Sequence, residues 1–193
     1  MRTWTLQGVL GLLGVLALMA GCSGPTAYLN PEADLSFYRR LGVAQFLTLA
    51  DDPKAGQKVQ RVFITELLKR KDHEVIAPGY FTKIETDVRN QLNITGDVPL
   101  DSAALQLIGQ KAGVQGIILG TVRDYRMERV GQEEFPMISL SLQMVDAPTG
   151  RIVWDISLGE RGGPKFPVLA IGETHTLDEL LTKLCRNSLR TLK

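Results

Sequence analysis

The 193-residue chain has few of the residues that build metal, covalent or nucleophilic sites. It contains two cysteines and two histidines, and aromatic residues make up 6% of it. It lacks the spaced cysteine and histidine sets of zinc sites. It also lacks a GxSxG nucleophile elbow, a phosphate-binding P-loop and a GxGxxG fingerprint. These absences predict a protein that is not an enzyme and that uses no metal and no cofactor.

An excess of charge of one sign is also missing. The 22 lysines and arginines nearly balance the 21 aspartates and glutamates. Capture of nucleic acid requires cations that neutralise several phosphates, and no block of basic residues stands out in the sequence. We therefore expect no nucleic-acid partner. The composition, 44% hydrophobic and 22% charged, is that of an ordinary globular domain.

A hydrophobic run long enough to cross a membrane is absent as well. The longest apolar run, "GVLGLLGVLALMA" at residues 8–20, has 13 residues. A helix needs about 20 residues to cross a bilayer. Arg2 precedes the run and small residues end it, which is the arrangement of a secretory signal peptide. An uncleaved anchor with an incidental cysteine is the alternative interpretation.

The four residues Met19, Ala20, Gly21 and Cys22 resemble the lipobox of bacterial lipoproteins. The resemblance implies cleavage before Cys22 and attachment of three acyl chains there, which is more than stable anchoring requires. Ser23 is not the aspartate that resembles an inner-membrane retention signal in enteric bacteria. We therefore expect the protein on the outer membrane, held by lipid on Cys22 and facing the periplasm.

The rest of the chain divides into a tether and one domain. Residues 1–21 are interpreted as the signal peptide, and residues 22–37 as the lipidated N-terminus and an extended tether. Residues 38–193 are expected to form a single periplasmic α/β domain. Once Cys22 is acylated, Cys185 is the remaining thiol, so no intramolecular disulfide is possible.

Hydrophobic periodicity predicts an α/β (α+β) fold. It has a mixed sheet of about five strands, antiparallel hairpins in its C-terminal half and helices packed against it. One helix is expected from Asp52 to Arg70, and another lies between an Asp101 cap and Gly113. Thr176 and Glu179 form a capping box for the last helix. The predicted strands are at 38–49, 73–78, 116–127, 137–146 and 151–158, with turns at 129–136 and 146–150.

The segment 159–175, rich in glycine and proline, is predicted to be a long loop with a function. Phe166, Val168, Leu169 and Ile171 are too apolar for a solvated loop, so we expect them to bind a partner. The alternative is that they pack on their own domain.

Several other residues are candidates for chemistry, each with a structural alternative. His175 lies three residues before Asp178, which can orient an imidazole, but a solvated loop histidine is the commoner case. Cys185 precedes Arg186 but lies in a leucine stripe typical of a core. The remaining candidates are the glycines Gly113, Gly116 and Gly120 around a strand and the carboxylates Asp124, Glu128, Glu133 and Glu134 of a hairpin.

Four segments between residues 30 and 158 resemble a known family. They are "NPEADLSFYRRLGVAQF", "DDPKAGQKVQRVFITELLKRKDHEVIAPG", "AGVQGIILGTVRDYR" and "ISLSLQMVDAPTGRIVWDISL". The chain is similar to the periplasmic lipoprotein superfamily of the curli-secretion channel lipoprotein and the lipoprotein activators of penicillin-binding proteins. It departs from many members at "VAQFLTL", where they have a strand ending in "LPF".

This resemblance implies an α/β domain that binds other proteins, often in ring-shaped assemblies. The leading hypothesis is thus a non-enzymatic accessory factor in envelope biogenesis or export that acts through protein–protein contacts. Two alternatives remain. One is a small-molecule or nucleotide-binding domain that uses the helix starts at Pro53 and Asp101. The other is a homo-oligomeric structural ring.

Overall fold

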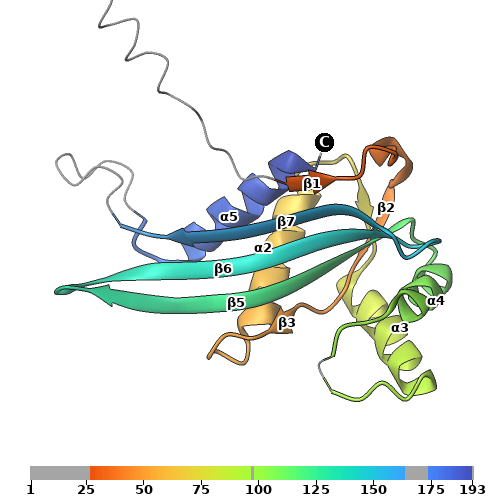
Figure 1. Cartoon of the computed structure of the whole chain (residues 1–193), viewed down its shortest axis with the longest axis horizontal. Coiled ribbons are helices and arrows are strands. Elements are labelled where there is room, and N and C mark those ends of the chain that lie inside the picture. The colour runs from red at the N-terminus through yellow and green to blue at the C-terminus, as the bar shows by residue number, and fades with distance from the viewer. Residues whose placement is uncertain (1–26, 97, 164–173, 193) are drawn as a thin grey trace, which may run out of the picture.

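Seven strands form one mixed sheet in the computed structural model, which describes residues 27–96, 98–163 and 174–192. The strand order is β1-β7-β6-β5-β2-β4, with β3 also paired to β5 (Figure 1). Strand β2 pairs in parallel with β4 and with β5, and β3 pairs in parallel with β5. The pairs β5–β6, β6–β7 and β7–β1 are antiparallel. The strands are β1 Ala27–Leu29, β2 Arg40–Val43, β3 Leu47–Thr48, β4 Glu74–Val75, β5 Gly116–Val130, β6 Glu133–Asp146 and β7 Ile152–Arg161. The mixed α+β fold with C-terminal hairpins is thus confirmed.

Four α-helices and a short 3-10 helix complete the described fold. They are η1 Leu35–Phe37, α2 Ala55–Leu68, α3 Pro78–Gln91, α4 Ser102–Ala112 and α5 Leu177–Thr191. The Asp101 side chain caps α4 by accepting from the backbone N–H of Ala104, and Gly113 ends this helix in the left-handed conformation. The Thr176 side chain likewise accepts from the N–H of Glu179 and starts α5. The Asp101 cap and the Gly113 stop are thus confirmed, and of the predicted capping box the bond to the Thr176 side chain is present.

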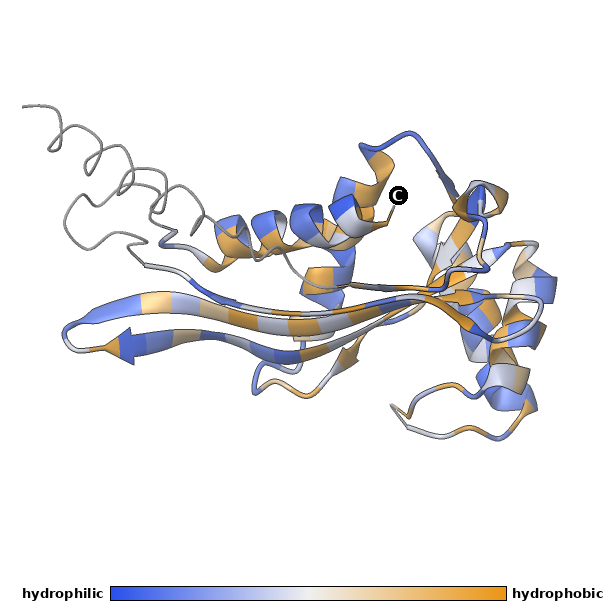
Figure 2. Ribbon diagram, turned by 45° about the horizontal axis from the view of Figure 1, so that its top comes forward, coloured by the Kyte–Doolittle hydropathy of each residue, from blue (hydrophilic) through white to orange (hydrophobic). Residues whose placement is uncertain are grey.

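The helices divide between the two faces of the sheet. Helices α2 and α5 pack on one face along β5, β6 and β7, over a core that includes Phe63, Leu140, Trp154 and Leu184. Helices α3 and α4 cover the other face at one end, around Ile117. Figure 2 shows the apolar side of α5 turned to the sheet and its polar side turned outward. The second face is therefore left open along much of its length (Figure 1).

The N-terminal segment holds a strand where the sequence predicted only a tether. Strand β1 pairs with β7, with Ala27 opposite Ile156 and Leu29 opposite Trp154. The helix η1 also falls within the predicted tether. Three extended residues are too few to show a periodic pattern, so β1 was not predictable from its own residues. It forms because it pairs with β7.

The hairpin between β5 and β6 is longer and tighter than predicted. The sequence placed a turn at 129–136, but the ladder runs on to Val130 opposite Glu133. The charged residues that suggested a loop lie on a hairpin that projects beyond the helices (Figure 1). Similarly, β7 continues to Arg161 inside the predicted loop 159–175. Pairing with β6 extends both strands past the point where apolar alternation fades.

Helix α2 starts two residues later than a Pro53 start would place it. Its N-cap is Lys54, which makes no side-chain capping bond. Asp52 instead accepts from the N–H of Lys54 at 2.8 Å and shapes the turn before the helix.

Within the described residues, none of the helices has the length and hydropathy needed to cross a bilayer.

Candidate functional site

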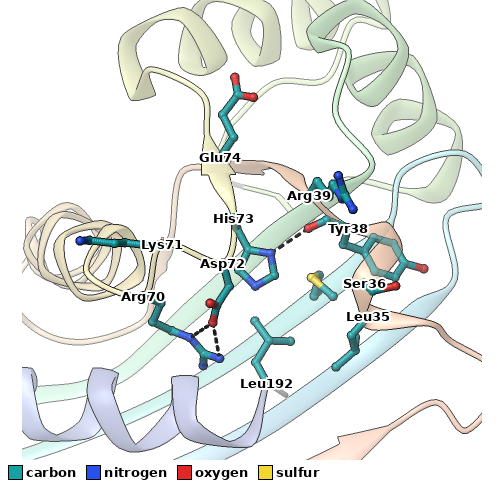
Figure 3. A pocket seen from close by; sticks show the side chains of 11 residues that line it. Leu35, Ser36, Tyr38, Arg39, Arg70, Lys71, Asp72, His73, Glu74 and Leu192 are labelled. Carbon is teal, nitrogen blue, oxygen red and sulfur yellow. Dashed lines mark hydrogen bonds and ion pairs between the residues drawn. The ribbon is translucent and has the colours of Figure 1, made fainter.

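An open pocket of about 800 Å³ lies between η1, the start of β2, the α2–β4 loop and the end of α5 (Figure 3). Figure 3 shows His73, Leu35 and Leu192 directed toward its centre, whereas Lys71 and Glu74 extend away from it. Its lining is Leu35, Ser36, Tyr38, Arg39, Arg70, Lys71, Asp72, His73, Glu74, Met144 and Leu192. The pocket therefore combines an apolar floor with a charged rim.

A buried hydrogen-bond chain starts from Tyr38 at this pocket. The Tyr38 hydroxyl donates to Asp146 Oδ1 at 3.2 Å. Asp146 Oδ2 accepts from the backbone N–H of Thr149 at 3.0 Å and from its hydroxyl at 2.5 Å. Burial, and then the Asp146 carboxylate, raise the pKa of Tyr38 to about 12. Tyr38 thus keeps its proton at neutral pH and joins the start of β2 to the β6–β7 turn.

His73 forms a hydrogen bond with the backbone. Its Nδ1 atom lies 2.8 Å from the carbonyl oxygen of Tyr38. Because a carbonyl oxygen only accepts, Nδ1 carries the proton and Nε2 is the acceptor of the neutral ring. A general base would need a hydroxyl, thiol or water-activating partner at Nε2. Within residues 27–96, 98–163 and 174–192, no side chain of this kind forms a hydrogen bond with Nε2 of His73.

Cys185 is a core residue. Its thiol is fully buried, and burial followed by the charge of Glu66 raises its pKa to about 12. The neighbouring Arg186 does not activate it, because the Arg186 Nε donates to Glu66 Oε2 at 3.3 Å. The structural interpretation of Cys185 is therefore correct.

Two of the four candidate carboxylates of the hairpin, Asp124 and Glu128, lie beside arginines. Arg126 pairs with Asp124 and lies 4.0 Å from Glu128, which is also 3.7 Å from Arg161. Across the described part of the chain, no three His, Cys, Asp or Glu residues gather into a metal-binding group.

The ring of His175 lies beside that of Phe135, with 6.4 Å between the two ring centroids.

The glycines considered as a ligand cradle serve packing. A Cβ on Gly116 would come within 2.8 Å of Leu41, and one on Gly120 within 2.6 Å of the Phe46 ring. At the start of α4, Asp101 already accepts from the N–H of Ala104 at 2.8 Å, an amide that a bound anion would use. The proposed nucleotide sites at the helix starts therefore gain no support from the geometry.

The open sheet face beside α3 and α4 is polar. We define the open face as the side chains of β5, β6 and β7 that point away from α2 and α5 beyond the cover of α3 and α4. Two cross-strand hydrogen bonds order it: Ser141 to Ser157 at 2.8 Å between their hydroxyl oxygens, and Gln143 Nε2 to Asp155 Oδ2 at 2.5 Å. The open face includes Thr121, Ser139, Ser141, Gln143, Asp155 and Ser157, and the register also places Asp124 and Arg126 of β5 on it, opposite Ser139 and Met137.

A smaller pocket of about 240 Å³ lies where α3 meets the open face. Its buried acid, Glu85, is 3% exposed and accepts from the backbone N–H of Gln45 and from Arg89 Nε, both at 3.1 Å. Gln143 of the open face lines the same pocket. The pocket is a polar depression at the edge of the open face, and the carboxylate of Glu85 already accepts hydrogen bonds within the protein.

The alternation of Ser139, Ser141 and Gln143 with apolar residues indicated a polar face of β6 from sequence. Only the structure shows that this face lies next to α3 and α4.

Five further predicted site residues lie outside the described residues, so their predictions stay untested: Cys22, Phe166, Val168, Leu169 and Ile171.

Comparisons with known proteins relate the chain to others by structure alone. No family model matches the chain, and no curated protein matches its sequence. Among solved structures, the PelC dodecamer from Paraburkholderia phytofirmans matches with a TM-score of 0.58 at 15% identity, covering 86% of this chain and 94% of that chain. Lipoprotein GNA1162 from Neisseria meningitidis matches with a TM-score of 0.54 at 16% identity, covering 80% and 97%. The chain thus shares its fold with at least one bacterial lipoprotein.

Proposed function

We propose that this protein is an outer-membrane-anchored periplasmic lipoprotein that acts as a non-enzymatic accessory factor in envelope biogenesis or export. The observation that carries the proposal is the shared fold with lipoprotein GNA1162 and PelC over most of each chain. The sequence adds the lipobox that ends at Cys22. Function would then depend on contacts with another envelope protein.

The open face is the surface proposed for that contact. Its serines and amide are half-buried or exposed, and their cross-strand hydrogen bonds hold them in fixed positions. A polar, ordered surface suits a non-obligate partner, because such interfaces are about as polar as the rest of a protein surface.

A photo-crosslinking amino acid at Ser157 tests this contact. Ser157 is exposed on the open face, and Gln57 is exposed on α2 on the other side of the sheet. In intact cells, we expect one defined adduct from Ser157 and none from Gln57, with the partner identified by mass spectrometry. Equal adduct patterns from the two positions would contradict the assignment of the open face.

The apolar loop residues are a second proposed part of the contact surface. Deletion of residues 162–172, which contain Phe166, Val168, Leu169 and Ile171, should reduce the Ser157 adduct while the unfolding midpoint of the domain stays unchanged. An unchanged adduct would remove the loop from the proposed surface.

A homo-oligomeric ring is the second candidate function. The matching PelC structure is described as a dodecamer. Within the described residues, pairing at the outer edge of β5 ends at Val122, and pairing at the outer edge of β7 ends at Ile156. These free edges lie on opposite sides of the three-stranded β5–β6–β7 segment and are suited to head-to-tail pairing between copies. Light scattering of the detergent-solubilised protein should then give a mass of many chains, and a monomeric mass would refute the ring.

A further inference from the structure

Cations from three separate segments of the chain meet at one end of the molecule. Pocket-lining residues place Lys69, Arg70, Arg186 and Arg190 around one hollow, and Arg70 also borders the pocket of Figure 3 beside Arg39 and Lys71. We call this surface the basic end. It consists of Arg39, Lys69, Arg70, Lys71, Arg186 and Arg190.

The basic end carries a net positive charge. Its six cations face three carboxylates: Glu66, which pairs with Lys69 and Arg186, Asp72, which pairs with Arg70, and Glu74, which lines the pocket of Figure 3. This leaves three positive charges in excess, although the net charge of the whole chain is +1. The remainder of the protein is therefore net negative, and the basic end is a localised feature.

Three of these cations have no acidic partner. In the described parts of the chain, no ion pair involves Arg39, Lys71 or Arg190, and the one side-chain contact among them joins Arg190 to the neutral amide of Asn187 at 3.4 Å. Their charges are available to an external anion. Their removal should also leave the fold intact.

The basic end lies beside the strand that follows the proposed lipid anchor. Leu29 of β1 is opposite Trp154, and the Trp154 indole donates to Thr191 Oγ1 in the residue after Arg190. Arg70 in turn donates to the carbonyl oxygen of Leu189. These contacts link β1, the end of α5 and the end of α2 into one region (Figure 1).

Strand β1 also shortens the distance between the domain and the membrane. Ala27 is held by pairing with Ile156, five residues after Cys22. At about 3.5 Å per residue, this part of the chain spans at most about 18 Å. A lipidated Cys22 therefore keeps the β1 region close to the headgroups, rather than at the end of the extended tether that the sequence predicted for residues 22–37.

Exposed apolar side chains adjoin the cations. Leu68 next to Lys69 is 54% exposed, Phe37 near Arg39 is 53% exposed, and Leu29 of β1 is 39% exposed. Basic residues with interspersed aromatic and aliphatic side chains are typical of surfaces that lie on a membrane interface.

We propose that the basic end binds anionic phospholipid headgroups, such as those of phosphatidylglycerol, and so fixes the orientation of the domain on the membrane. This inference rests on the proposed lipid anchor at Cys22. The acyl chains would retain the protein, and the basic end would select the face that contacts the bilayer. The open face, on the opposite side of the sheet from α2 and α5, would then remain accessible to a partner.

The test uses the lipidated full-length mature protein in vesicles. A fluorophore is attached at Thr65→Cys, one turn before Lys69 on α2, and in a second sample at Gln132→Cys, which is exposed at the tip of the β5–β6 hairpin, away from the basic end (Figure 1). Cys185 does not compete for the label because it is buried. A quencher on the lipid headgroup should quench the Thr65 label more than the Gln132 label in vesicles with 30% phosphatidylglycerol, and this difference should be smaller in purely zwitterionic vesicles.

Two triple variants separate the basic end from general charge. Arg39→Gln, Lys71→Gln and Arg190→Gln together remove the unpaired cations, whereas Lys54→Gln, Lys83→Gln and Arg151→Gln remove three exposed cations elsewhere. Each cation near an anionic surface contributes about fivefold, so the first variant should lower the ratio of docked to undocked protein by about a hundredfold. The control variant should leave it unchanged, and about 1 M salt should weaken docking of the parent protein.

Equal quenching in anionic and zwitterionic vesicles would overturn the proposal, as would equal effects of the two triple variants. Loss of a protein crosslink in the first variant, with quenching unchanged, would assign the basic end to an acidic protein and also overturn it. Acyl labelling of Cys22 is measured on the same samples. A missing label would instead mark the failure of the proposed anchor.

Discussion

The indole N–H of Trp154 donates a hydrogen bond to Thr191 Oγ1 at 3.0 Å. Trp154 is fully buried in the core between the sheet and α5, and the Thr191 hydroxyl donates in turn to the carbonyl oxygen of Ser188. This short chain fixes the last turn of α5 against β7. It also holds together the region that contains β1.

Thr191→Val should destabilise the domain, because it leaves the buried indole N–H without an acceptor. An unsatisfied buried donor costs about 1–3 kcal/mol, which urea unfolding would measure. Thr65→Val is the matched control, since the Thr65 hydroxyl donates only to the carbonyl of Arg61 on an exposed helix surface. Equal losses from the two variants would show that the indole contact contributes nothing.

Glu66 should make stability depend on pH in the acid range. Burial alone would raise its pKa, but hydrogen bonds from Lys69 and Arg186 outweigh burial and lower the pKa below its ordinary value. A lowered folded-state pKa stabilises the fold above the unfolded pKa of about 4.3, and this contribution is lost as pH falls through the folded value. The free energy of unfolding should therefore drop below about pH 4.5, and it should drop less steeply in Glu66→Gln. Identical slopes would refute this assignment.

Gly120→Ala should destabilise the domain by about 1–3 kcal/mol, because its Cβ would meet the buried Phe46 ring at 2.6 Å. Gly79→Ala is the control, since nothing lies within 4 Å of a Cβ at that helical position. It should stabilise by about 0.4–1 kcal/mol, because alanine has fewer unfolded conformations than glycine. Thermal unfolding of the two variants measures both effects, and a shift of the same sign in each would contradict the packing role of Gly120.

Cys22→Ala should abolish acyl labelling and leave the signal peptide uncleaved. Metabolic labelling with a palmitate analogue measures the first effect, and the mass of the protein measures the second. Cys185→Ala serves as the control and should retain both label and processing. Continued labelling of Cys22→Ala would refute the proposed lipidation.

Features that depend on neighbouring residues in the chain were predictable from the sequence. The Asp101 cap, the Gly113 stop and the Thr176 start of α5 each involve a side chain and a backbone amide within a few residues. The two C-terminal hairpins were also predictable, because a short turn sequence and apolar alternation define them locally.

Features that depend on distant partners were not predictable in the same way. Strand β1 needs β7, more than 120 residues away, and the ends of β5 and β6 need each other beyond their apolar residues. The basic end was likewise not predictable from the sequence. The sequence contains the run Lys69, Arg70 and Lys71, but the charge is balanced along the chain, and only the fold brings Arg39, Arg186 and Arg190 beside it.

By itself, the sequence determined the helix caps, the alternation of the central strands and the signal-like segment that ends at Cys22, because each is a pattern of adjacent residues. The tertiary structure decided which polar face of the sheet stays open, where the cations gather and how short the link to Cys22 is. Each of these depends on packing and pairing between segments that are far apart in the chain, so no local pattern encodes them.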